Sequence, residues 1–492
     1  MQRSVQGSGA GAAAGHPLES GRPLIIDGDH LVGHLPLLVE AIFSYIKPNP
    51  SRLAQVFRWL LKGQANAELK LAQAADLDGV RLPITPSLAE YADATSQLGR
   101  DVYLFMSRPA PLLARLLQQA PHVARLIEPA GAASAGAQPS RAEALVQQFP
   151  QGFDYAGRSG NDLDVWRQAS HAVLVDTPTD VERRVGEVAS VIATFHTPSA
   201  FTGLLKSLRL HQWVKNVIVF VPIILGGHLA DVEAMLHTLI AFIALGLVAS
   251  ATYLINDVWD MADDRKHWSK RNRPIAAGNL PVGTAVLAAP LIILPALLLA
   301  ASVSYATLAI VLVYLAVTLA YSFGLKRIPF VDGLVLATLF TVRLAIGSAA
   351  AQVPPSSWLF VFSMFLFASL SYAKRHTEIA RVIERQYATV NGRGYRTVDA
   401  PLVLTVGVAS GIAAVMIMVL YIVEEAFLYS FYGSTQWLWG FPVLVFLFVM
   451  RIWLVSARGE MHDDPVAFAV RDRACLALLA LLVVCFAFAW LG

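Results

Sequence analysis

Three aspartates and one asparagine follow directly on an apolar run and share one short stretch of chain. Asn256, Asp257, Asp260 and Asp264 form the pattern N-D-x-x-D-x-x-x-D. Spacings of three, four and seven residues put the three carboxylates on one face of a helix. Clustered carboxylates repel one another, and such hard oxygen ligands suit Mg²⁺ that also carries water and substrate phosphates. We therefore predict that the three aspartates hold Mg²⁺ and act in catalysis, with Asn256 contacting the substrate.

The alternative for this stretch is a solvated helix end without a catalytic role. Its carboxylates would then pair with Arg265 and Lys266, which follow directly in the chain. The apolar run up to Ile255 argues against this alternative. It seats Asp257 at or just below a membrane surface, where an unpaired carboxylate is costly and is usually functional.

The composition indicates the kind of protein that carries this motif. The chain has 492 residues, of which 56% are hydrophobic and 15% are charged, and its mean hydropathy is +0.54. Such a chain is too apolar for a soluble enzyme of this length, so it belongs in a membrane, and we expect no nucleic-acid partner. Cys475 and Cys485, both in the last apolar run, form neither a disulfide framework nor a metal-binding pattern.

Apolar runs long enough to cross a bilayer begin only near Trp213, which makes the chain bipartite. The sequence predicts about nine transmembrane helices, at 213–230, 234–255, 281–303, 305–322, 330–351, 357–373, 401–424, 437–456 and 473–491. The loops on one side of these helices hold the Lys and Arg residues, and the opposite loops hold none. By the positive-inside rule, the basic loops and the N-terminal part face the cytoplasm from the cytoplasmic (inner) membrane.

Residues 22–200 alternate short apolar runs with helical patterns, which is typical of an α/β domain. The runs "PLIIDGDH" (23–30), "DVYLFMS" (101–107), "GFDYAG" (152–157) and "HAVLVD" (171–176) predict strands. We divide the chain into a disordered tail at 1–21, an α/β domain at 22–176, a linker without a strong element at 177–205, and a transmembrane domain at 206–492.

The aspartate pattern resembles the first aspartate-rich motif of the UbiA-type intramembrane prenyltransferases, a family of multi-pass α-helical membrane proteins. Four further stretches are similar to the branch that makes polyprenylphosphoryl 5-phosphoribose: "HQWVKNVIVF" (211–220), "KRNRPIAAG" (270–278), "YSFGLKRIPFVD" (321–332) and "AKRHTEI" (373–379). The resemblance spans about 206–492. It implies Mg²⁺-dependent transfer of 5-phosphoribose from phosphoribosyl diphosphate to a polyprenyl phosphate.

One departure from the wider superfamily favours this branch. A second D-x-x-x-D motif usually follows the sixth helix, whereas here the same place holds Lys374, Arg375 and Glu378. Basic residues suit a donor with an additional 5-phosphate, although Lys374 and Glu378 could also form a plain i,i+4 salt bridge. The residues that we predict to bind substrate are Asn256, Lys215, Arg265, Lys266, Arg273, Lys326, Lys374, Arg375 and Glu378.

Two isolated charges, Asp332 and Arg343, lie in the fifth predicted helix, where charges are rare. Their separation of about 16 Å along a helix prevents a direct pair. We expect Asp332 to join the polar site, and Arg343 to bond a carbonyl or carboxylate elsewhere.

The N-terminal domain resembles the haloacid-dehalogenase-like phosphatases that are fused to some UbiA-type proteins. Asp27, Asp29, Ser107 and Asp162 match that family's site, with Asp27 and Asp29 as the nucleophile and the acid/base. However, His30 and Leu31 replace the usual Gly-Thr, Arg141 replaces a lysine, and Arg158 replaces a metal-binding Asp or Asn. Because aspartate-nucleophile chemistry needs both the metal and the lysine, we predict a degenerate or weak phosphatase, and whether the domain retains phosphatase activity stays open.

Two other functions stay open. Prenyl transfer from a polyprenyl diphosphate to an aromatic acceptor would differ in the diphosphate consumed. A transporter or scaffold would use the acidic stripe as an ion site, but transporters often have duplicated halves, and the sequence contains no second N-D-x-x-D. The lipid chain length and a homo-oligomeric state also stay open.

Overall fold

The computed structural model describes residues 21–32, 34–77, 80, 84–107, 109–119, 124–127, 140–196, 199–266, 270–384, 394–428, 432–461 and 464–491. The predicted disordered tail therefore lies outside the described residues, except for Gly21. The chain divides into two units. The first consists of Met1–Leu204 and Asp264–Ala285, and the second of Leu205–Asp263 and Val286–Gly492.

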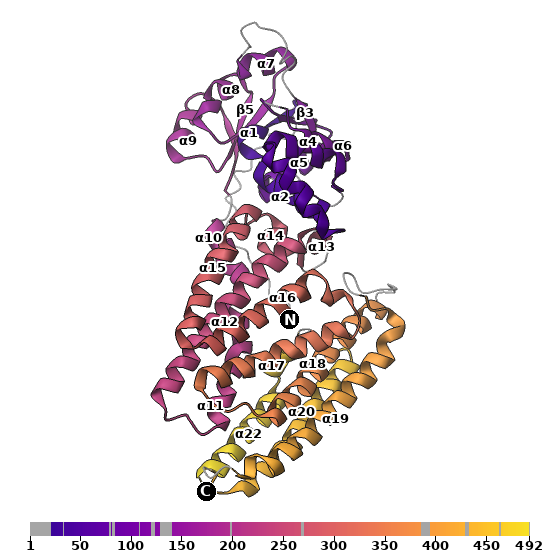
Figure 1. Cartoon of the computed structure of the whole chain (residues 1–492). Helices are drawn as coiled ribbons and strands as arrows, with labels where there is room; N and C mark the ends of the chain where they lie inside the picture. The colour runs from indigo at the N-terminus through magenta and orange to yellow at the C-terminus, as the bar shows by residue number, and fades with distance from the viewer. Residues whose placement is uncertain are drawn as a thin grey trace. The chain divides into compact units, whose positions relative to one another are not determined.

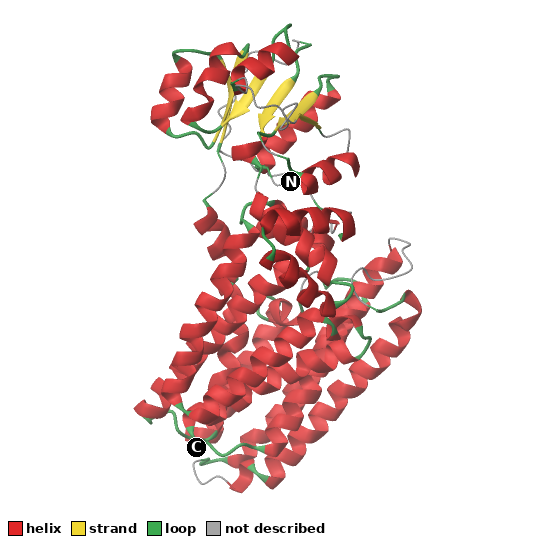
Figure 2. Ribbon diagram, turned by 45° about the horizontal axis from the view of Figure 1, so that its top comes forward, coloured by secondary structure: helices red, strands yellow, loops and turns green. Residues whose placement is uncertain are grey.

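A parallel sheet of six strands forms the centre of the first unit, in the order β3-β2-β1-β4-β5-β6 (Figure 2). The strands are β1 (Leu24–Asp27), β2 (Val102–Phe105), β3 (Arg125–Ile127), β4 (Asp154–Gly157), β5 (His171–Val175) and β6 (Val191–Phe195). Leu24 and Ile26 lie in one buried apolar cluster and Ile25 in another, because successive strand residues face opposite sides of a sheet. The sheet is buried on both faces, so the α/β prediction is confirmed.

Helices on both faces of the sheet contribute the other residues of these two clusters. Figure 1 shows these helices around the strands. On one face lie α2 (His34–Ile46), α3 (Leu53–Leu61), α4 (Gln64–Ala74), α5 (Pro86–Gln97) and α6 (Pro111–Gln119). On the other lie α7 (Arg141–Gln148), α8 (Leu163–Gln168) and α9 (Thr179–Gly186). The short α1 (Gly28–Leu31) follows β1 directly. The ends of β1, β2 and β4 meet at one edge of the sheet, where polar side chains from different loops come together.

All four predicted strands are present, but the structureless linker at 177–205 is wrong. That stretch holds α9, β6 and the start of α10 (Ala200–Leu208). Val181 and Val185 of α9 are four residues apart and pack together into the core. Two strands were not predicted. The strand β6 pairs with β5 and its side chains are half-buried or exposed, and β3 has only three residues.

Among the described residues, nine helical segments are long and apolar enough to cross a membrane, in agreement with the sequence. They are Ala200–Leu225, Val232–Trp259, Val282–Val303, Tyr305–Phe323, Val331–Ala351, Ser357–Glu384, Thr397–Leu428, Thr435–Ala457 and Arg473–Leu491. Their helices are α10, η3 (Leu210–Phe220), α11 (Val221–Leu225), α12 (Val232–Trp259), α15 (Val282–Val303), α16 (Tyr305–Phe323), α17 (Val331–Ala351), α18 (Ser357–Glu384), α19 (Ala400–Glu424), α20 (Gly440–Ala457) and α22 (Arg473–Leu491).

Two of these segments differ from the predicted bounds in a way that matters for the site. The first begins at Ala200 instead of near Trp213, so it includes Arg209 at the junction of α10 and η3. The sixth continues to Glu384 instead of ending near residue 373. Its extension carries Arg375, Thr377 and Ile379, which are buried inside the unit and therefore keep the helix intact beyond its apolar part.

Candidate active site

The aspartate motif lies where a membrane helix ends. Asn256 and Asp257 belong to the last turn of α12, Asp260 is its C-terminal cap, and a new helix, α13 (Met261–Lys266), begins directly afterwards. The single helical stripe expected from the spacing is therefore interrupted at Asp260. The end of a helix carries partial negative charge from its free carbonyl groups. Carboxylates at this end consequently need strong positive partners.

Arg209 is the partner of Asp257. Its Nη2 donates to both carboxylate oxygens of Asp257, at 2.6 Å each, and Asp257 is only 2% exposed. The backbone of Arg209 has a φ of 50°, in the left-handed region that side chains rarely adopt. Its guanidinium carbon lies 5.0 Å from the centre of the Tyr253 ring. The sequence analysis missed Arg209, and the available signal was its position just before the motif that begins at residue 211.

Lys326 is the partner of Asp260. It lies in η5 (Leu325–Arg327), and its Nζ donates to the two Asp260 oxygens at 2.6 and 2.5 Å and to Oδ1 of Asn256 at 3.2 Å. The structure thus brings Lys326, predicted from a separate stretch of sequence, to two residues of the aspartate motif. Carboxylate and amide oxygens are hard ligands, so Asp257, Asp260 and Asn256 fit Mg²⁺ by their chemistry. In this structure, Arg209 and Lys326 supply the positive charge beside these oxygens, so the two cations compete with Mg²⁺ for the same atoms.

The turn that carries Lys326 is held by a buried network of hydrogen bonds. Phe330, with a φ of 65°, donates its N–H to Oη of Tyr395 at 2.8 Å, and its carbonyl accepts from Tyr372 at 3.0 Å. Tyr395 donates to Oδ1 of Asp332 at 2.6 Å. Burial and the hydrogen bond to Asp332 raise the pKa of Tyr395 above its usual value, so the phenol keeps its proton. This network fixes the left-handed backbone that ends the turn.

Arg375 is a further member of this hydrogen-bond network. Its Nε donates to Oδ2 of Asp332 at 2.5 Å, its Nη1 to Glu378 at 2.5 Å, and its Nη2 to Oη of Tyr321 at 3.4 Å. The Arg375 side chain is 1% exposed, and that of Asp332 is 0% exposed. Each of the three donating nitrogens of Arg375 has a protein acceptor in this structure, and the predicted phosphate contact stays a prediction. Asp332 bonds Arg375 and Tyr395, and its predicted place in the polar site around the aspartate motif also stays a prediction.

Lys374 and Lys215 meet at a residue that the sequence analysis did not single out. Both Nζ atoms donate to Oδ2 of Asp464, at 2.8 Å from Lys374 and 3.3 Å from Lys215. Glu378, the alternative partner considered for Lys374, accepts from Nη1 of Arg375 at 2.5 Å, and the described pair of Lys374 is with Asp464. Nothing in a single sequence connects Asp464 to Lys215 across 249 positions.

Arg343 lies deeper in α17, as expected for a residue that supports packing. Its guanidinium donates to the Leu339 carbonyl at 2.6 Å, to Oδ1 of Asn216 at 3.0 Å and to Oη of Tyr314 at 3.0 Å. The expected carbonyl partner is therefore present.

The remaining predicted residues belong to the first unit. Asp264, the third aspartate predicted to hold Mg²⁺, accepts from Nη1 of Arg273 at 2.6 Å, and its role as a metal ligand stays a prediction. Arg265 donates to both carboxylate oxygens of Glu40, at 2.7 and 2.8 Å, and its predicted substrate contact stays a prediction. The side chain of Lys266 lies outside the described residues.

The α/β unit brings its four predicted site residues together around Arg141. This guanidinium contacts Asp29 at 2.7 Å, Asp162 at 2.9 Å, Oγ of Ser107 at 3.2 Å and Asp27 at 3.3 Å. Asp29 also accepts the N–H of Ser107, at 3.1 Å. Burial and the nearby Asp162 raise the pKa of Asp27 above its usual value, although Arg141 and His30 act in the opposite direction. Arg158 is exposed, and only its backbone N–H bonds Asp162.

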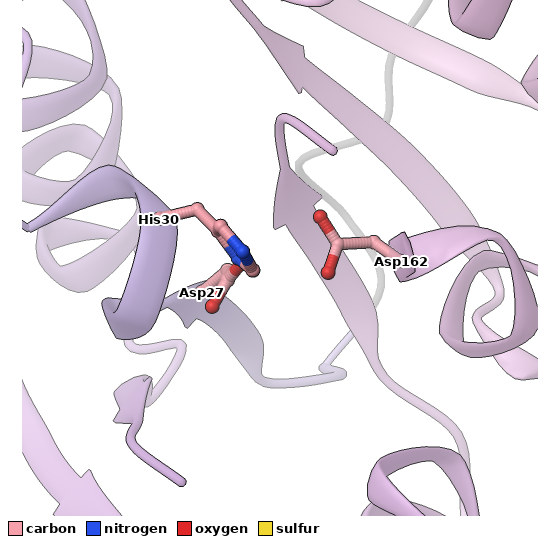
Figure 3. Close-up of side chains that lie close together, drawn as sticks. All are labelled: Asp27, His30 and Asp162. Carbon is pink, nitrogen blue, oxygen red and sulfur yellow. The ribbon is translucent and has the colours of Figure 1, made fainter. Parts of the chain in front are cut away.

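His30 was missed as a possible ligand in this unit. Its Nδ1 lies 2.6 Å from Oδ2 of Asp27, and Figure 3 shows both side chains beside Asp162. Ligand atoms of these three residues all lie within 4.8 Å of one another. Two carboxylates and an imidazole fit a divalent cation by their chemistry. Arg141, however, already pairs with Asp27 and Asp162, so it competes with any cation for the same oxygens.

Comparisons with known proteins give further information. The UbiA prenyltransferase family model matches residues 219–470. An uncharacterized protein of Sinorhizobium fredii, y4nM, is 35% identical over 471 residues, which are 95% of this chain and 91% of that protein. A decaprenyl-phosphate phosphoribosyltransferase of Mycobacterium tuberculosis is 32% identical over 287 residues, which are 57% of this chain and 91% of that enzyme. A solved UbiA homolog from Archaeoglobus fulgidus, bound to GPP and Mg²⁺, is 13% identical with a TM-score of 0.45, covering 58% of this chain and 98% of that one.

Proposed function

The chain belongs to the UbiA prenyltransferase family, and from this premise we propose that it transfers 5-phosphoribose from phosphoribosyl diphosphate to a polyprenyl phosphate at the cytoplasmic membrane face, releasing diphosphate. With its nine apolar segments among the described residues, this UbiA-family transferase is an integral membrane protein. The similarity to a decaprenyl-phosphate phosphoribosyltransferase supports the proposed donor and acceptor.

The observation that carries the proposal is the meeting of Lys215 and Lys374 at Asp464. A prenyl diphosphate has one polar end, which the aspartate motif and Mg²⁺ can hold. Phosphoribosyl diphosphate and a polyprenyl phosphate together bring two further phosphate groups, and ammonium groups can bind these without metal. Two lysines near each other are therefore better explained by phosphoribosyl transfer than by prenyl transfer.

In the proposed reaction, an oxygen of the lipid phosphate attacks the anomeric carbon, the bond between that carbon and the diphosphate breaks, and diphosphate leaves. The lipid phosphate is already ionised at neutral pH, so we assign no general base. Asp257, Asp260 and Asn256 would hold Mg²⁺, which supplies positive charge to the leaving diphosphate. Arg209 and Lys326 lie beside the same oxygens and add fixed positive charge.

The test of this function is an assay of the purified protein with radiolabelled phosphoribosyl diphosphate, Mg²⁺ and polyprenyl phosphates of several chain lengths. We expect the label to move into the lipid fraction. Prenyl transfer is the alternative, and the same protein would then consume a polyprenyl diphosphate in the presence of an aromatic acceptor. Label transfer from the prenyl donor alone would contradict the proposal.

We expect Lys326→Ala to lower kcat about a hundredfold, because it removes a fixed positive charge beside the leaving group. The matched control is Arg327→Ala, the next residue, whose side chain is exposed. Steady-state kinetics with both substrates varied give kcat and KM for each variant. An unchanged kcat in Lys326→Ala would limit this lysine to a structural pair with Asp260.

For the α/β unit, we propose that the site around Arg141 has lost phosphatase turnover and that the unit is structural or regulatory. Arg141 lies within 3.3 Å of all three aspartates. An arginine in this position holds the carboxylates that a nucleophile and a metal would require.

We therefore expect the full-length wild type and the Asp27→Asn variant to hydrolyse phosphomonoesters at the same rate with Mg²⁺ present. Generic substrates could miss a specific activity, so the assay includes the phosphoribosyl lipid itself, which a tethered phosphatase would meet at high effective concentration. Phosphate release by the wild type but not by Asp27→Asn would overturn this expectation and make the chain bifunctional.

A further inference from the structure

Two lysines from distant parts of the chain share one carboxylate oxygen. Lys215 in η3 and Lys374 in α18 both contact Oδ2 of Asp464, at 3.3 and 2.8 Å. Ammonium groups this close repel each other, and one carboxylate neutralises only one of them. Two positive charges and one negative charge leave one positive charge uncompensated in this lysine pair cluster (Lys215, Lys374 and Asp464).

Asp464 is held in place by its own helix as well as by the lysines. It is the N-terminal cap of α21 (Pro465–Ala469), where its Oδ1 accepts the N–H of Val466 at 3.1 Å. Burial raises the pKa of the Asp464 carboxyl. Lys374 and Lys215 together lower this pKa by more than burial raises it, so the pKa lies well below its usual value. Asp464 is therefore a carboxylate at neutral pH. Its Oδ1 caps α21, and its Oδ2 accepts from the two lysines.

The cluster is open enough for a ligand to reach it. The side chains of Lys215, Asp464 and Lys374 are 17%, 24% and 33% exposed. A phosphomonoester dianion carries two negative charges and three terminal oxygens, so it can neutralise both ammonium groups and accept more hydrogen bonds than one carboxylate oxygen can. Such a ligand fits the charge of the two lysines better than Asp464 does.

We propose that Lys215 and Lys374 form a subsite for a phosphomonoester dianion, and that the Asp464 carboxylate occupies this subsite in the free protein and leaves it when the ligand binds. Asp464 is then an internal competitor that sets the affinity for phosphate. The Asp464 carboxylate also disfavours singly charged anions. Such an anion gains little binding free energy when it replaces a carboxylate of the same charge. The ligand phosphate is either the 5-phosphate of the sugar or the phosphate of the lipid.

The chain offers a matched pair of substitutions for the test. Asp464→Asn removes the charge but keeps an oxygen that can cap α21, since asparagine is as good a cap as aspartate. Asp472→Asn is the control. Asp472 lies on the same connection between α20 and α22, pairs with Nη2 of Arg451 at 2.9 Å and accepts the N–H of Cys475. It does not contact the two lysines in the described hydrogen bonds.

The experiment titrates the full-length protein in detergent micelles with ribose 5-phosphate in one arm and farnesyl phosphate in the other, by isothermal calorimetry. We expect Asp464→Asn to lower Kd about tenfold in one arm, because a competing charge has gone, and Asp472→Asn to leave Kd unchanged. The arm that responds identifies sugar phosphate or lipid phosphate as the ligand. In the double variant Asp464→Asn/Lys374→Met, the gain in phosphate affinity should be abolished.

Weaker or unchanged binding of both phosphates by a folded Asp464→Asn protein would overturn the proposal, as would a gain that survives Lys374→Met. The inference rests on the proposed function only for the identity of the phosphorylated substrate. Tighter phosphate binding by Asp464→Asn, together with a wild type that transfers no phosphoribose, would support the subsite while rejecting the proposed reaction.

Discussion

We expect replacement of Asp257 or Asp260 by asparagine to lower kcat for the proposed phosphoribosyl transfer by at least about a hundredfold, the scale of a lost electrostatic contact in an active site. The amide keeps the shape of the side chain but removes the charge that would hold Mg²⁺. Asp257 is buried and bonded through both oxygens to Arg209, and Asp260 through both to Lys326. Each substitution therefore also leaves a cation beside the leaving group without its counter-charge.

The control is Asp263→Asn, an exposed aspartate in the same stretch of chain. We expect this variant to keep full activity. Melting curves in detergent separate loss of chemistry from loss of folding, and a titration with Mg²⁺ up to high concentration tests whether weaker metal binding alone explains the defect. Full activity in either Asp257→Asn or Asp260→Asn would end the interpretation of this motif as a metal site.

Much of this site was accessible from the sequence because its chemistry is local. Asn256, Asp257 and Asp260 are neighbours in the chain, and their spacing alone indicates a shared function. Lys326 was found through a second short motif, and the structure brings it to Asp260. Arg209 and Asp464 were missed, because their roles come from contacts across 48 and 249 positions that no pattern within one sequence records.

The fold was likewise predicted where the sequence signal is local and missed where the structure depends on contacts between distant residues. Membrane segments were predicted well, since crossing a bilayer requires a continuous apolar run that any window of sequence reveals. The end of α18 was placed too early, because the buried charges that extend it are paired with residues on α16 and α17. In the α/β unit, β6 was missed, and its place at the edge of the sheet comes from its pairing with β5. Burial by distant partners, and not local propensity, decided these cases.

Arg375→Met should destabilise the protein by about 3–5 kcal/mol, the usual result of breaking a buried ion pair. The substitution removes the guanidinium that pairs with the Asp332 carboxylate, which is 0% exposed. Asp332→Asn should cost less, because Arg375 keeps Glu378. Unfolding by sodium dodecyl sulfate in mixed micelles measures the free energy of unfolding of both variants. Arg381→Met is the matched control on α18, and we expect a loss of about 1 kcal/mol there, since this guanidinium donates to the Met461 carbonyl.

The double variant Arg375→Met/Asp332→Asn separates a structural ion pair from a substrate contact. If the two residues mainly neutralise each other, the double variant loses less stability than the two single losses combined, because no unpaired charge stays buried. Activity of the single variants should fall through kcat, since the network fixes the turn that carries Lys326 at Asp260. The phosphate contact predicted from the sequence requires the opposite result. Arg375→Met would then raise KM for phosphoribosyl diphosphate, with stability unchanged and no coupling to Asp332.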